Sequence, residues 1–122
     1  MATVVGPGLV TLSAAQTGNG ASTNILEDAD LLNPALVTIV TTIGATPTVL
    51  IDLQGSVDGV DWWNVAYATT AAPETPVVSQ VGPITTATTT RLILRPTAPW
   101  RYFRLLYSAN TNVTSTATVF TF

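Results

Sequence analysis

Two stretches of this chain carry most of the information about its fold: Leu53-Gln-Gly-Ser-Val-Asp-Gly-Val-Asp-Trp-Trp63 and Trp100-Arg-Tyr-Phe-Arg-Leu-Leu-Tyr107. The residues that lead into the first stretch alternate between apolar and polar, which is the period of a half-buried strand. Asp58-Gly59 then signals a tight turn, because glycine accepts a positive φ and Asp can bond to its own backbone. Trp62-Trp63 opens the returning strand. The first stretch therefore predicts a β-hairpin in which one indole faces inward and its neighbour outward.

The second stretch predicts a strand with two different faces. Phe103, Leu105 and Tyr107 share one face, and Tyr102 and Arg104 share the other. Arginines spaced along a strand usually mark a solvated or an interface face. Further strand patterns, separated by turn signals, cover residues 36–43, 48–54, 62–68, 77–81, 88–95 and 114–122. With about seven to nine short strands and no helical period, the sequence predicts an all-β fold, an antiparallel β-sandwich or jelly roll.

Residues 1–24 differ in composition from the rest of the chain, because they are rich in Gly, Ala, Ser, Thr and Asn. One interpretation is a disordered tail. The segment also holds apolar residues that a solvated tail does not need, namely Val4, Val5, Leu9, Val10 and Leu12. We therefore expect two parts: an extended arm over residues 1–24 that adds to a neighbouring subunit, and a β-sandwich domain over residues 25–122.

The composition limits the partners that this chain can bind. Of its 122 residues, 47% are hydrophobic and only 9% are charged, whereas about a quarter is usual for a soluble domain. The net charge is −3, and the chain has no Lys and no His. We expect no nucleic-acid partner, because phosphate binding needs clustered cations. No apolar run is long enough for a transmembrane helix, so we expect no membrane association. The N-terminus lacks a basic signal region, so we expect the chain to be made in a cytoplasm.

The residues that enzymes use are largely missing. Without His and Cys, the chain can build neither the common nucleophile–base pairs nor a typical zinc site, and without Lys it can form no Schiff base. Asp52, Asp58 and Asp61 lie around the hairpin, and a glycosidase would need two such carboxylates facing a cleft. The tight turn already accounts for Asp58, and Asp61 flanks that turn. A second group of acids lies at residues 27–30, where a calcium site is conceivable and a solvated turn is the simpler interpretation. We expect no enzymatic activity and no cofactor or metal.

The three tryptophans allow two interpretations. Trp62, Trp63 and Trp100 could stack on sugar rings, because their faces are flat and aromatic. They could equally be core or interface anchors, which is the usual place for such large apolar side chains, and this is the interpretation we favour.

The hairpin and the later strand together resemble a known group of domains. Gln54-Gly-Ser-x-Asp58-Gly59-x-x-Trp62, followed by Arg101-Tyr102-x-Arg104-Leu105, is similar to small, loosely discoidin-like β-sandwich domains of tailed-phage virion proteins. Such domains occur in capsid decoration (cement) proteins, head fibres and tail appendages. The resemblance covers under half of the chain and carries over no catalytic residue.

The resemblance implies a role in the virion. We expect a decoration protein on the outer surface of the capsid that binds the assembled head through the major capsid protein and stabilises it by bridging subunits. A homotrimer around a symmetry axis would fit this role. The alternatives are a carbohydrate- or receptor-binding module of a fibre or tail appendage, and a domain of a larger surface assembly without a ligand of its own. Asp58 and Gly59 form a structural turn, and the candidate interface residues are Val4, Val5, Leu9, Val10, Leu12, Trp63, Tyr102 and Arg104.

Overall fold

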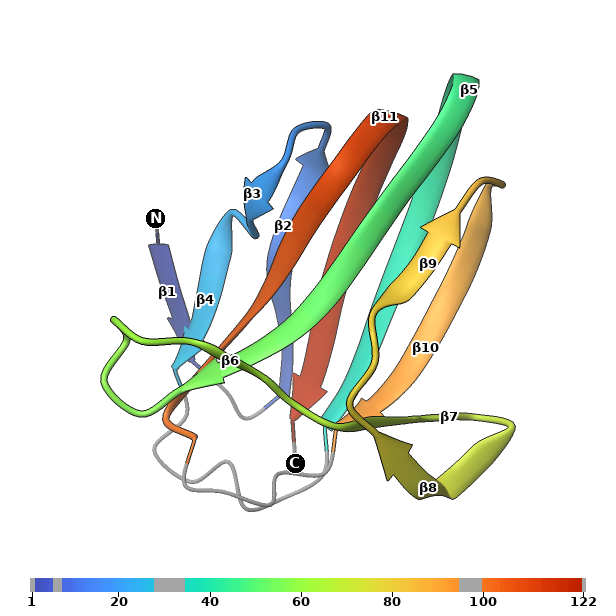
Figure 1. Ribbon diagram of the computed structural model, residues 1–122. Coiled ribbons are helices and arrows are strands. Elements are labelled where there is room, and N and C mark those ends of the chain that lie inside the picture. Colours follow the sequence, from blue (N-terminus) through green and yellow to red (C-terminus); the bar gives the residue numbers. More distant parts are fainter. Residues whose placement is uncertain (1, 6–7, 28–34, 95–99, 122) are drawn as a thin grey trace.

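The computed structural model describes residues 2–5, 8–27, 35–94 and 100–121 (Figure 1). Within these ranges the chain forms strands and no helix, so none of them holds a helix that could span a membrane. The expected all-β class is therefore confirmed. The strands are β1 (Ala2–Val5), β2 (Gly8–Gln16), β3 (Gly20–Ala21), β4 (Asn24–Glu27), β5 (Ala35–Ser56), β6 (Trp63–Asn64), β7 (Tyr67–Thr69), β8 (Ala72–Val77), β9 (Val81–Ile84), β10 (Thr88–Leu94) and β11 (Tyr102–Thr121).

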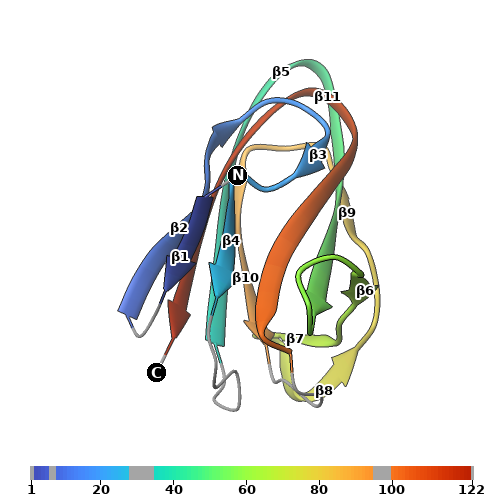
Figure 2. The same cartoon turned by 90° about the vertical axis from the view of Figure 1, so that its left-hand side faces the viewer.

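Two long strands, β5 with 22 residues and β11 with 20, organise the sheet. They pair with each other in antiparallel fashion from Tyr102↔Ser56 to Thr121↔Ala35. Both strands turn over at the same end of the molecule and run back, which Figures 1 and 2 show at the top of each view. One sheet therefore folds over on itself, and its two halves face each other.

The other strands extend these two halves. In the first layer, the first half of β5 lies beside the second half of β11; β10, β7 and β8 continue this layer on one side and β2 on the other. In the second layer, the second half of β5 lies beside the first half of β11. There β3 and β4 pair with β11, β1 pairs with β4, and β6 and β9 pair with β5. Among the described strands every pair is antiparallel except β1 with β4.

The hydrophobic core lies between the two layers. Alternate residues of each strand point into it, as the period of the sequence predicts. In β11, Phe103, Leu105 and Tyr107 are at most 1% exposed, while Tyr102 and Arg104 between them are half-buried. The same alternation buries the inward residues in the second half of β11 and in the neighbouring strands β5 and β10, which are Val37, Ile39, Val49, Ile51, Leu53, Leu92, Leu94, Val113, Ala117 and Val119.

The long strands differ from the sequence prediction, which placed separate strands on each side of residues 44–47 and 108–112. In the structure both segments are bends within continuous strands. Thr46, Ala109 and Asn112 adopt positive φ values of 50–53° there, which turns the chain without ending it. The next segment also differs: two prolines among residues 69–76 favour a loop there, with a strand over 77–81, whereas in the structure β8 covers Ala72–Val77 and residues 78–80 form no strand. Pro73 and Pro76 are compatible with this, because β8 lies at the edge of the sheet, where a missing N–H costs no ladder bond.

The structure also gives the N-terminal segment a place in the sheet, where the sequence suggested an arm over residues 1–24. β2 pairs with β11 from Gly8↔Thr121 to Gln16↔Ser115. Leu12 is fully buried in the core, and the Tyr107 hydroxyl donates a hydrogen bond of 3.0 Å to Ser13 Oγ. The physical reason is that β11 would otherwise expose an open edge and leave the core uncovered on that side. Val4 and Val5 belong to β1, and their side chains lie outside the described part of the structure.

Candidate functional site

The hairpin loop after β5 is held by its own side chains. Asp58 Oδ1 accepts hydrogen bonds from the backbone N–H groups of Val60 at 2.8 Å and Asp61 at 2.9 Å. The bond from Asp61, followed by that from Val60, lowers the pKa of the Asp58 carboxyl below its ordinary value. Ser56 Oγ donates to the same carboxylate and accepts from the Gly59 N–H. Gly59 has a φ of 79°, the positive value that the Asp-Gly pattern predicts.

This loop lies against the outer face of the second layer. A Cβ atom built on Gly59 would lie 3.4 Å from the Tyr102 ring, so the loop backbone packs closely on that aromatic side chain. Immediately before β6, the indole of Trp62 covers the guanidinium of Arg104, with 4.2 Å between Arg104 Cζ and the ring centroid. This distance is within the range of a cation–π contact.

A row of polar side chains crosses three strands beside this contact. Arg104 pairs in register with Gln54, and Gln54 pairs with Asn64, so the three side chains lie on the same outer face of β11, β5 and β6. Arg104 Nε donates to Gln54 Oε1 at 2.9 Å, and Gln54 Nε2 donates to Asn64 Oδ1 at 3.1 Å. Asn64 thus fixes the orientation of the Gln54 amide, and that amide fixes the guanidinium.

We define the Arg104 surface as Gln54, Val60, Trp62, Tyr102 and Arg104. Partial burial lowers the pKa of Arg104 from its ordinary value, because desolvation disfavours its charge, yet an arginine side chain remains a cation. Val60 is 77% exposed at the tip of the loop. The surface therefore combines one oriented cation with two aromatic rings and an exposed apolar tip, and arginine and aromatic residues are enriched at the centres of protein interfaces.

Trp63 and Trp100 form a separate aromatic pair at the end of the second layer. Their ring centroids lie 6.0 Å apart, and the planes are tilted by 31°. The expectation that one residue of the Trp62-Trp63 pair enters the core is wrong. Trp63 is 53% exposed, Trp62 lies on Arg104, and it is Trp100 that packs against the core. The Trp100 indole packs directly on Gly55, whose missing side chain leaves room for it.

The acidic segment has a partner on the neighbouring strand. Glu27 accepts a 3.1 Å hydrogen bond from Arg101, and the pKa of Arg101 rises mainly because of this bond. Asp28 and Asp30, the other acids considered for calcium, lie outside the described residues. Across the described ranges, no group of three or more acids or other metal ligands comes together.

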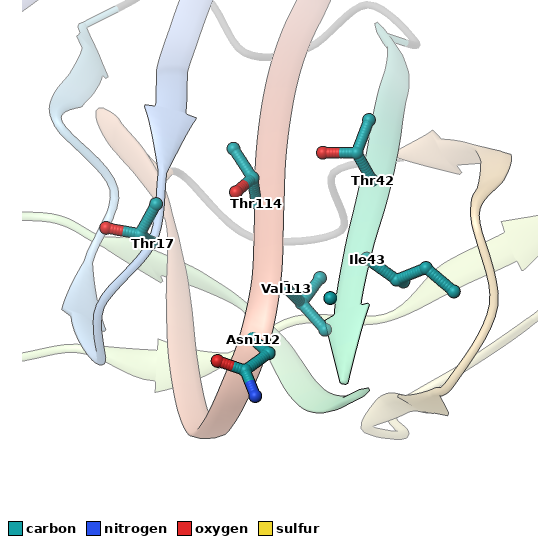
Figure 3. A pocket seen from close by; sticks show the side chains of 7 residues that line it. Thr17, Thr42, Ile43, Asn112, Val113 and Thr114 are labelled. Atoms are coloured by element: carbon teal, nitrogen blue, oxygen red, sulfur yellow. The ribbon is translucent and has the colours of Figure 1, made fainter. Parts of the chain in front are cut away.

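A shallow pocket of about 390 Å³ lies where the long strands bend (Figure 3). It is lined by Thr17, Thr42, Ile43, Gly44, Asn112, Val113 and Thr114. Its polar groups are hydroxyls and the Asn112 amide, whose Nδ2 already donates to the Ala45 carbonyl. These lining residues contain no titratable group, so the pocket has no acid or base for catalysis.

The outer face of the first layer carries an apolar row that sequence reasoning did not identify. In register across β2, β11, β5 and β10 lie Leu9, Phe120, Leu36 and Ile93. Leu9 is 68% exposed and Phe120 40%. The next row on this face holds three threonines and one arginine, namely Thr11, Thr118, Thr38 and Arg91. Only strand register brings the four apolar residues together, although each occupies an outward position in its own strand.

The predicted interface residues fall into different environments. Leu12 is a fully buried core residue, and Val10 is half-buried and packs against the core. Leu9 belongs to the exposed apolar row. Tyr102 and Arg104 lie together on the Arg104 surface, whereas Trp63 lies beside Trp100.

Comparisons with known proteins bear on the fold alone. No family model matches the sequence, and no curated protein matches it either. The fold is similar to the crystal structure of the SPBc2 prophage-derived protein YomS, with a TM-score of 0.58. That similarity covers 91% of this chain and 88% of YomS, at 10% sequence identity.

Proposed function

We propose that this chain is a structural protein of a phage virion, and more narrowly a decoration protein that binds the assembled head and stabilises it. The observation that carries the proposal is that the folded sheet presents adhesive groups on both of its outer faces. The apolar row lies on the first layer, and the Arg104 surface lies on the second. A chain with two such faces can contact two neighbours at once.

The fold supports the phage assignment. YomS is described as prophage-derived, and it shares this arrangement over most of both chains. The likeness does not distinguish a head protein from a tail protein. We favour the head because only 9% of the residues are charged, which suits a protein that is packed against several neighbours in a shell.

The mechanism is adhesion and not chemistry. Burying threonines and apolar residues of the sheet face costs less desolvation free energy than burying charged side chains would. A specific protein interface usually buries about 1,200–2,000 Å² in total. Each of the two faces would form an interface of its own with a different neighbour. Because the chain would bind the assembled lattice and not the free subunits, mass action would shift the equilibrium toward the intact shell. We propose the major capsid protein as the partner.

We further propose that the protein forms a small closed ring, with a homotrimer as the first choice. Closed symmetry covers adhesive surface that a monomer would leave exposed. Sedimentation equilibrium of the purified protein measures this directly. A monomer at micromolar concentration, together with isolated single copies on the particle, would contradict the ring.

The decisive experiment locates the chain on its particle. Heads assembled with the gene for this chain deleted are mixed with purified protein, and the decorated heads are then imaged by electron cryomicroscopy and heated. We expect extra density on the outer surface of the head and a higher temperature of shell disruption. Density at a fibre or tail tip would support the receptor-binding alternative, and absence of binding to heads would refute the decoration role.

A further inference from the structure

We propose that the Arg104 surface is a docking centre that receives the carboxylate of an Asp or Glu side chain on the partner protein. This inference rests on the proposed function, because the partner would be the protein that forms the shell. It adds the chemistry of the contact: a carboxylate bound by both terminal nitrogens of one guanidinium.

The first argument is that Arg104 is held in place but not paired. Nε donates to Gln54, and the flat face of the guanidinium lies on Trp62. Neither contact uses the two terminal nitrogens, and no described residue accepts a hydrogen bond from them. These nitrogens form the fork that matches a carboxylate in bidentate geometry.

The second argument comes from comparison with Arg101. Arg101 is the neighbouring cation on the same chain segment, and its terminal nitrogen lies 3.1 Å from Glu27. In the described ranges no carboxylate lies within salt-bridge distance of Arg104, which is the more buried of the two. A partly desolvated cation without an acid is unfavourable in the isolated chain, and an acid from outside would relieve this.

The third argument is that the site is already ordered. Asn64 orients Gln54, Gln54 orients Arg104, and Trp62 closes the far side. Freezing a long side chain on binding usually costs about 0.5–1.5 kcal/mol. Here the fold has already restricted Arg104, so the binding of a carboxylate needs to spend less free energy on ordering this side chain.

The surroundings indicate a protein and not an acidic sugar as the source of the carboxylate. Val57 is 52% exposed and Val60 77% exposed on the loop that carries Trp62. Such apolar tips gain from contact with another apolar surface. Arg, Trp and Tyr are also the residues most enriched at the centres of protein interfaces. A carboxylate bound to Arg104 would then be shielded from water by the apolar contacts that Val57 and Val60 make with the partner.

The test measures binding of purified variants to assembled heads that lack this chain. Arg104→Gln removes the charge and the fork, Arg104→Lys keeps the charge without the fork, and Arg91→Gln is the control. Arg91 is exposed on the outer face of the first layer, so its removal changes the net charge equally. We expect Arg104→Gln to weaken binding about tenfold or more, and Arg104→Lys to recover only part of that loss. Because Arg91 lies in the row beside the proposed apolar contact, Arg91→Gln serves as the charge-matched comparison: it should weaken binding less than Arg104→Gln does, and an equal loss would mean that net charge, and not the fork, carries the binding.

A second measurement uses the unaltered protein, so it does not depend on the folding of any variant. In the density of decorated heads, we expect an Asp or Glu of the shell protein within ion-pair distance of the Arg104 guanidinium. Wild-type binding should also weaken as salt rises, and Arg104→Gln should flatten that dependence.

The outcomes separate the two proposals. If heads bind the protein but Arg104→Gln binds as tightly as the wild type, the docking inference is wrong and the decoration role remains. If the density of decorated heads shows no shell carboxylate near Arg104, the docking inference is likewise wrong and the decoration role remains. Displacement of the protein by free glucuronate, with no displacement by a Glu-rich peptide, would identify an acidic sugar and overturn the inference. If the wild type binds no heads at all, both proposals fail.

Discussion

Gly55 is the position where a single added methyl group should be most informative. It lies in β5 beside Trp63 of β6, and its face points toward the interior. A Cβ atom there would lie 2.8 Å from Cδ2 and 2.9 Å from Cγ of Trp100, and 3.0 Å from Cγ1 of Val65. Carbon atoms in favourable contact lie about 3.5–4.0 Å apart. Gly55→Ala therefore forces the indole or the strand to move by several tenths of an ångström.

The expected cost follows from how freely Trp100 can move. A methyl group forced into a well-packed site costs about 1–3 kcal/mol. Trp100 is only partly buried, but Trp63 covers its ring, so the indole cannot leave without losing that contact. With an unfolding entropy of about 2.1 cal/mol/K per residue, a chain of 122 residues loses about 4 °C in Tm for each kcal/mol. Gly55→Ala should lower Tm by about 4–12 °C.

The assay is thermal and urea unfolding followed by circular dichroism, in two backgrounds. In Trp100→Leu the two contacts with the indole are removed and only Val65 at 3.0 Å remains, so Gly55→Ala should cost clearly less than in the wild type. Gly18→Ala is the control, since no atom lies within 4 Å of its Cβ position. The reasoning is refuted if Gly55→Ala leaves Tm unchanged, or if it costs as much with Trp100→Leu as in the wild type.

Two further predictions concern single residues whose environment the structure defines. Burial raises the pKa of Tyr107 to about 12, against a smaller opposing effect of its bond to Ser13; because the folded state holds the phenolic proton more tightly, stability is complete below pH 10 and should fall by about 2–3 kcal/mol as pH rises through 12. Urea titrations across this range should show the fall in the wild type and a much smaller one in Tyr107→Phe. Gly59→Val should destabilise by about 1 kcal/mol or more, because a β-branched residue is strained at a φ of 79° and its Cβ would press on Tyr102. Asp61→Asn is the matched change in the same loop, and an equal loss of stability there would contradict the turn as the cause.

The sequence alone predicted the parts of this fold that depend on alternation and turn chemistry. Phe103, Leu105 and Tyr107 face the core because side chains alternate along a strand. Asp58-Gly59 forms its turn because the preferences of those two residues are local. The absence of His, Cys and Lys also follows from reading the chain, and with it the expectation of a binding role.

Only the tertiary structure decided which residues meet. Thr46 and Ala109 bend two strands instead of ending them, because β5 and β11 pair with each other before and after the bend, with register shifts at the bend itself. Leu12 belongs to the core because β11 needs a neighbour, and nothing within residues 1–24 specifies that neighbour. Arg104, Gln54 and Trp62 form one surface through register and loop packing. Local sequence determines the direction in which a side chain points, whereas contacts between distant segments depend on the free energy of the whole fold.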